Sequence, residues 1–147
     1  MRHSQSPSDT ISKYKAPSKT ASHHQSQSVT VKHCMSLSVT VKHCRSPSVT
    51  VSHCQSHTVT VSNCNSPSVT ASKQKSTSVT VVHSQSPWVT VSYSQYLLVI
   101  VIHCQSLSVT VSHRKTPLFI VSNCQSLSVT VRHCQSQPVA DSLCKSL

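Results

Sequence analysis

The chain repeats one pattern of apolar and polar residues every ten positions along its whole length. The consensus is Val-Ser-His-Cys-Gln-Ser-(Pro/Leu)-Ser-Val-Thr, and two neighbouring copies read VTVKHCRSPS and VTVSHCQSHT. The place of a residue in this unit is the last digit of its number, with zero standing for the tenth place. Val occupies the ninth place from Val29 to Val139, except at Phe119. Self-similarity at a fixed period indicates a repeat architecture.

Each unit contains one strand-forming segment, Ser-Val-Thr-Val-Ser-His. It is rich in β-branched residues and alternates apolar with polar residues, which is typical of a half-buried strand. Because ten is an even number, every copy keeps the same alternation. Continued through the unit, the alternation predicts two Val and the His on one face. Thr, Ser or Lys, and Cys then lie on the other.

The connection between strands decides the fold class. Gln-Ser-Pro-Ser reads as a turn or loop. Tight two-residue hairpins need residues at positive φ, usually Gly or Asn, and the chain contains no Gly. Wider arcs are therefore favoured, and we predict an all-β repeat array of short Val-Thr-Val strands, arranged like a solenoid with two units per coil. The alternative is a largely disordered low-complexity chain, because Ser-rich segments lose much entropy for little burial.

The repeat also predicts the domain organisation. Residues 1–147 form a single array of about fifteen ten-residue units, and the degenerate copies in 1–28 are expected to be disordered. Neither end resembles the capping repeats that solenoids usually need. The start has no apolar signal-peptide region, and the longest apolar run is far shorter than the ~18 residues of a membrane span. We therefore expect an intracellular protein with free thiols.

One segment, Tyr96–Ile102, departs from the repeat. Ile100 and Ile102 replace the Thr and Ser of other copies, so the segment loses its polar side. It is either a better-buried strand or an aggregation-prone segment through which the chain self-associates, since it combines high β-propensity with no charge and no Pro.

The charge balance points to polyanions as partners. The chain has 13 Lys and Arg against 2 acidic residues, giving a net charge of +11. Such an excess favours nonspecific contact with nucleic acid or an anionic surface. The basic residues are scattered along the sequence, and no base-reading element is visible. Binding should therefore weaken with salt, show no sequence preference, and strengthen toward pH 6 as histidines gain charge.

The repeated His-Cys pairs suggest metal ligands, but their spacing argues against a chelate. Adjacent residues of a strand point to opposite faces, so one pair cannot hold an ion. Stacked rungs about 4.8 Å apart would still align successive cysteines, which suits a soft metal or oxidation. The cysteines expected in this ladder are Cys34, Cys44, Cys54 and Cys64. Gln74, Ser84, Ser94 and Arg114 interrupt it.

Catalysis has little support in the sequence. Two carboxylates leave little to orient a histidine base, and a chain without Gly has no Gly-rich phosphate loop. We assign no catalytic, cofactor-binding or metal-ligating residue, and no cofactor. We expect no enzymatic activity.

Differences between copies lead to our first hypothesis about the origin of the chain. The seventh place holds Pro47, Leu37, Gln27, His57 and Thr77, which differ in size and polarity but are close neighbours in the genetic code. This pattern indicates weakly filtered mutation of a tandemly duplicated unit. We therefore expect a tandem-repeat translation product without dedicated activity. The alternative is a structural or interaction protein on a β-repeat scaffold, with weak nonspecific polyanion or metal binding.

The coding DNA tests the duplication hypothesis. An unselected repeat should show synonymous and nonsynonymous differences between units at similar rates. Sequencing the gene and comparing its units would measure this ratio, and a clear excess of synonymous differences would contradict the hypothesis.

Overall fold

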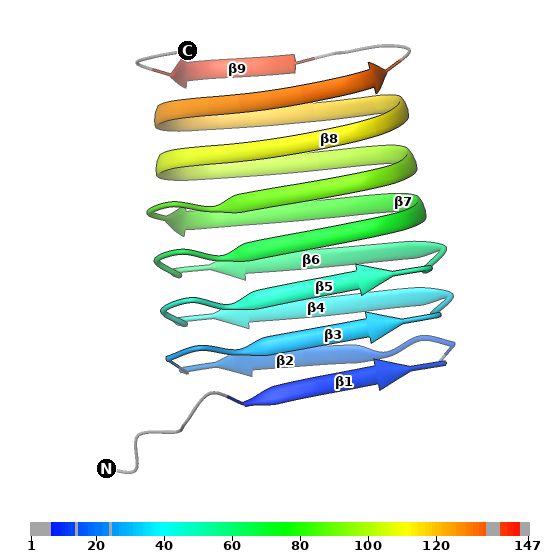
Figure 1. Ribbon diagram of the computed structural model, residues 1–147. Coiled ribbons are helices and arrows are strands. Elements are labelled where there is room, and N and C mark those ends of the chain that lie inside the picture. Colours follow the sequence, from blue (N-terminus) through cyan, green and yellow to red (C-terminus); the bar gives the residue numbers. More distant parts are fainter. Residues whose placement is uncertain (1–6, 14, 24, 135–138, 145–147) are drawn as a thin grey trace.

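The computed structural model is a parallel β-solenoid in which the chain winds about six times around one axis (Figure 1). It describes residues 7–13, 15–23, 25–134 and 139–144. Strands make up 77% of it, and the described residues contain no helix. The predicted all-β, solenoid-like array is therefore confirmed.

Nine strands build the coil. They are β1 (Ser8–Ser12), β2 (Ser18–Ser22), β3 (Ser28–Lys32), β4 (Ser36–Lys42), β5 (Ser48–Ser52), β6 (Ser56–Ser62), β7 (Ser68–Ser84), β8 (Trp88–Cys134) and β9 (Val139–Cys144). Their order in the sheet is β1-β3-β5-β7-β6-β4-β2, with β8 on β7 and β9 on β8. Because β7 and β8 continue around the bends, they join the two sides of the stack.

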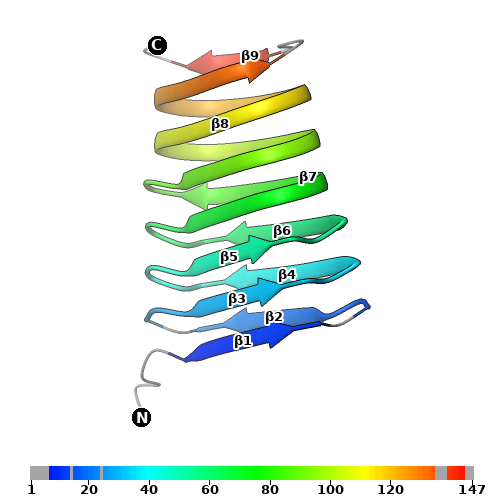
Figure 2. The same cartoon turned by 45° about the vertical axis from the view of Figure 1, so that its right-hand side comes forward.

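Every strand pair has the same register, a step of twenty residues. Val29 lies beside Val49 in the pair β3–β5, and Val39 lies beside Val59 in the pair β4–β6. One coil therefore contains two ten-residue units, as predicted. The first face of the solenoid carries β1, β3, β5 and residues 68–72, 88–92, 108–112 and 128–132. The second face carries β2, β4, β6 and residues 78–82, 98–102 and 118–122, on the opposite side of the stack (Figure 2).

Two rows of bends connect the faces and form the edges of the solenoid. Edge A, at the right in Figure 1, consists of residues 13 and 15–17, the bends 33–37, 53–57, 73–77, 93–97 and 113–117, and residue 133. Edge B, at the left, consists of residues 23 and 25–27 and the bends 43–47, 63–67, 83–87, 103–107 and 123–127.

A left-handed residue starts each bend. All thirteen third places from Lys13 to His133 have φ between 52° and 61°. This conformation costs roughly 1–2 kcal/mol for residues other than Gly, and His and Asn tolerate it better than most. It also interrupts the alternation of the strand, so that the third place points outward and the fourth inward. The predicted faces of His and Cys are therefore wrong: His53 is exposed, whereas Cys54 is buried.

The core consists mainly of stacked Val columns. Val29, Val31, Val59 and Val61 are 0% exposed, and the ninth and first places stay buried or nearly so in every coil from Val29 to Val121. The fourth and seventh places fill the bends at either end of these columns. Burial of each Val contributes about 1.5–3 kcal/mol, so the repeat provides a continuous hydrophobic core.

Many strands begin directly after a Pro at the seventh place. These are β1, β2, β5, β7 and β8, and the lack of an N–H on Pro is compatible with this start. β4 and β6 have Leu37 and His57 at this place and start at the sixth place. Pro is not the sole determinant, because β3 starts at the eighth place after Gln27 and Pro117 lies inside β8.

The first coil carries charges where other coils carry Val. Asp9 and Lys19 occupy its two ninth places and form an ion pair of 2.9 Å, and Gln27 Nε2 donates to Asp9 Oδ2 at 3.4 Å. This polar pair closes the lower end of the apolar columns in the manner of a capping repeat, which we did not predict from the sequence. The segment 1–28, for which we predicted disorder, contains β1 and β2 in the structure.

The apolar segment Tyr96–Ile102 lies within β8. Leu97, Val99 and Val101 point into the core and are buried, whereas Ile100 and Ile102 point outward and are half-buried. The segment is therefore a strand with one side in the core and a half-buried apolar outer side.

The left-handed third place predicts that substitution by Gly has opposite effects on stability at two nearby lysines, Lys73 and Lys75. Lys73 has φ 55° and Lys75 does not have positive φ, while both side chains are exposed. Lys73→Gly should raise the free energy of unfolding by about 1 kcal/mol, because Gly adopts this conformation without strain. Lys75→Gly should lower it by about 0.5–1 kcal/mol, because Gly weakens an extended segment. Denaturant unfolding of both variants measures the signs, and destabilisation by both would contradict the assigned bend.

Candidate functional site

The twenty-residue coil divides the cysteines between the two edges. Cys34 and Cys54 lie on edge A and form a disulfide with a Cα–Cα distance of 4.6 Å. Cys104 and Cys124 lie on edge B and form a second disulfide, with a Cα–Cα distance of 4.9 Å. The predicted single ladder is therefore wrong, because successive cysteines alternate between edges. The expectation of free thiols is also wrong for these four residues.

Cys44 and Cys64 are free thiols buried on edge B. The Cys44 N–H donates to Cys64 Sγ at 3.4 Å, and the Cys64 thiol donates to the carbonyl of Ser62 at 3.4 Å. Burial raises the pKa of the Cys64 thiol. Because the thiolate is both the nucleophile and the metal ligand, this environment disfavours either role near neutral pH.

Polar residues replace Cys at some fourth places and are accommodated in the core by hydrogen bonds. Gln74 follows Cys54 on edge A, and its Nε2 donates to the carbonyls of Ser72 at 2.8 Å and Val51 at 3.3 Å. Its Oε1 accepts from the Cys54 N–H at 3.1 Å, so the amide is satisfied within the bend. Ser94 continues this column and donates to the carbonyl of Tyr96 at 2.9 Å. The side chains of Arg114, Cys134 and Cys144 lie outside those the structure describes.

Imidazole rings form exposed stacks on both edges. On edge B, His23 stacks on His43 and His83 on His103, with ring centroids 4.9 and 4.8 Å apart. On edge A, the stacked pairs are His33–His53, Tyr93–His113 and His113–His133, at 5.0, 4.6 and 4.8 Å. The left-handed third place turns these side chains outward, and the coil pitch sets their spacing.

The imidazoles are arranged as stacked ring pairs. The His–His pairs have ring centroids 4.8–5.0 Å apart and interplanar angles of 6–13°. In the part of the chain that the structure describes, no group of three His, Cys, Asp or Glu side chains is arranged to hold a metal.

Lysines gather on edge A. The described cationic side chains of its bends are Lys13, Lys15, Lys73, Lys75 and Lys115, whereas those of edge B contain Arg45. Asp9, whose carboxylate the structure describes, lies in the first coil and pairs with Lys19. The asymmetry is not apparent along the sequence, because residues of the same edge are separated by multiples of twenty. Sorting the lysines by the predicted register of two units per coil would have shown it.

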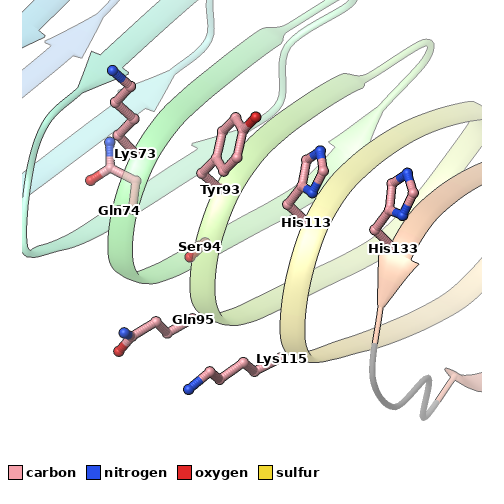
Figure 3. Close-up of a pocket in the computed structure, with 8 residues that line it drawn as sticks. All are labelled: Lys73, Gln74, Tyr93, Ser94, Gln95, His113, Lys115 and His133. Atoms are coloured by element: carbon pink, nitrogen blue, oxygen red, sulfur yellow. The ribbon is translucent and has the colours of Figure 1, made fainter.

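A groove of about 530 Å³ lies on this edge, between the bends of successive coils. Figure 3 shows Tyr93, His113 and His133 in a row on consecutive coils, with Lys73 continuing the row. Lys115 and Gln95 extend from the next part of the bends, and Gln74 and Ser94 complete the lining. The groove thus combines cations, imidazoles and neutral donors, which are groups that bind phosphate or other anionic oxygens.

Comparison with known proteins adds no functional assignment. Within the described ranges, no helix is long and apolar enough to cross a membrane. No family model, curated protein or solved structure matches the chain.

Proposed function

We propose that this protein is a non-catalytic structural scaffold that binds linear polyanions along edge A. The asymmetry of charge between the two edges carries the proposal. Five lysines of the described bends lie on edge A, with His33, His53, His113 and His133 in the same row of bends. From residue 13 to residue 133 the row spans six turns and is about 29 Å long, because neighbouring strands are about 4.8 Å apart.

The arrangement of these cations favours an anionic partner. Lys13 and Lys15 share one bend, and Lys73 and Lys75 share another, so like charges lie close together. A polyanion that follows the edge relieves this repulsion and releases its own counterions. The imidazole rows place further ring nitrogens in the same row of bends as these lysines. Contacts of this kind position a phosphate backbone but do not read a base sequence.

The contrast between places of the repeat supports a scaffold. From Val29 to Val131, the ninth and first places hold Val except at Phe119 and Ala71. The places that fill the bends vary more: Gln74 replaces Cys at the fourth place, and His57 and Thr77 replace Pro or Leu at the seventh. All places belong to the same duplicated unit, so unfiltered mutation would have altered them alike. Weakly filtered mutation therefore accounts for the bends, whereas the strand core is retained.

A non-catalytic role is consistent with the small number of carboxylates. The chain has 2 acidic residues, Asp9 and Asp141, and Asp9 is paired with Lys19 in the first coil. Among the described side chains, the carboxylate is therefore engaged in the first coil and does not orient an edge A histidine as a catalytic base.

A pair of charge-matched variants tests the proposed edge. Lys73→Gln/Lys75→Gln removes two cations from edge A, and Lys42→Gln/Arg45→Gln removes two from the second face and edge B. Binding of a single-stranded oligonucleotide is measured across salt concentrations by filter binding or fluorescence anisotropy. The edge A variant should reduce the slope of log affinity against log salt by about 1.4, because each lost phosphate contact contributes about 0.7.

The matched variant should leave that slope nearly unchanged, and wild-type affinity should rise as the pH falls from 7.5 to about 6. Oligonucleotides of different sequence should bind equally well. Equal losses in the two variants would show that only net charge matters and would refute a binding edge, as would affinity that is insensitive to salt.

A further inference from the structure

The second face carries a contiguous apolar patch on its solvent side. The twenty-residue register places Leu98 beside Ser78, Ile100 beside Thr80, and Ile102 beside Val82. The same step places Leu118 and Ile120 on the next coil, where they are 37% and 36% exposed. The apolar patch consists of Val82, Leu98, Ile100, Ile102, Leu118 and Ile120.

The other described outward places of the two faces do not form such a patch. On the first face the outward places hold mainly Ser and Thr, with Trp88 as the large apolar exception. On the second face, Lys42 is the charged residue among the described outward places, and it lies two coils below Val82. A groove of about 450 Å³ adjoins the patch and is lined by Tyr96, Leu97, Leu98, Pro117 and Leu118, together with four Ser and Thr residues. Exposed apolar areas of this kind mark interaction surfaces.

We propose that a second copy of this chain covers the patch, in a two-fold symmetric dimer in which second face packs on second face. Two copies carry the same apolar residues at the same height of the coil. A two-fold rotation therefore sets Leu98, Ile100 and Ile102 of one copy against the same residues of the other, across the spacing of about 10 Å found between packed sheets.

The symmetry axis follows from the positions of the patch and of the lysines. The patch lies in the C-terminal half of the solenoid, so an axis parallel to the solenoid axis brings patch onto patch. The same rotation places edge A of each copy beside edge B of its partner. The lysine rows of the two copies are thereby kept apart. A two-fold axis perpendicular to the solenoid axis and in the plane of the second face would instead place edge A of one copy beside edge A of the other. It would also pack the patch against the Ser, Thr and Lys42 side chains of the N-terminal coils.

The contact area sets the expected strength. Six strands about 4.8 Å apart and five residues of about 3.3 Å each give the second face about 480 Å² per copy. Two copies then bury about 1,000 Å² in total, which is at the lower limit for a specific interface. The dimer should therefore be weak and concentration-dependent. Because each copy has a net charge of +11, added salt should strengthen it by screening repulsion.

Sedimentation equilibrium of the full chain tests the dimer. Ile100→Thr/Ile102→Ser/Ile120→Thr introduces the residues that other coils carry at these places, so the fold should tolerate it. This variant should weaken dimerisation by about tenfold or more, because several buried methyl and methylene groups are lost. The control is Trp88→Ser, which restores the repeat residue on the first face and should leave the dimer unchanged.

A second variant, Ile100→Lys, should abolish the dimer, because it places a charge at the centre of the patch. Circular dichroism of each variant checks that the β fold is retained. A wild-type protein that stays monomeric at high concentration and high salt would overturn the proposal. So would a dimer that weakens equally in the Trp88→Ser control. The salt dependence separates this test from polyanion binding, which should weaken as salt is added.

Discussion

The left-handed residue at the third place of the units from Lys13 to His133 is the constraint on which the rest of the structure depends. It ends the alternation of the strand, turns the chain into a bend, and sends the third side chain outward and the fourth inward. Cys and Val therefore share one core, while His and Lys line the edges. Since the chain has no Gly, this conformation recurs at roughly 1–2 kcal/mol per unit for most residues, which the buried Val columns offset.

The strands and their pairing could be predicted from the sequence. Which side chains of the bends point into the core and which point outward could not. Val-Thr-Val alternation and an even repeat length were enough to predict a solenoid of two units per coil. The alternation was then extended one residue too far, across His53 to Cys54, because nothing in the sequence marks a positive φ when Gly is absent. This error placed Cys on the outside and suggested a single thiol ladder. The two disulfides follow from the column arrangement that replaces it.

The candidate site was hidden for a related reason. Lys13, Lys15, Lys73, Lys75 and Lys115 look scattered in the sequence, and only the twenty-residue step gathers them on one edge. The Asp9–Lys19 pair is similar, since two isolated charges become a cap when the first coil brings its two ninth places together. Polar substitutions in the core were also unpredictable, because Gln74 is accommodated by backbone carbonyls that the bend itself provides.

Duplication of the unit explains why the surface is regular. The fold explains which substitutions in the repeat gather on one surface. The retained Val columns and the gathered lysines favour a scaffold with one basic edge, while the apolar patch gives the second face a different character from the first. Both features require a folded array, so the existence of a cooperative β structure is the central claim. Far-UV circular dichroism of the purified chain during heating tests it most directly. A β-type spectrum that is lost in a cooperative thermal transition is the predicted result. A coil spectrum with no transition would contradict the account.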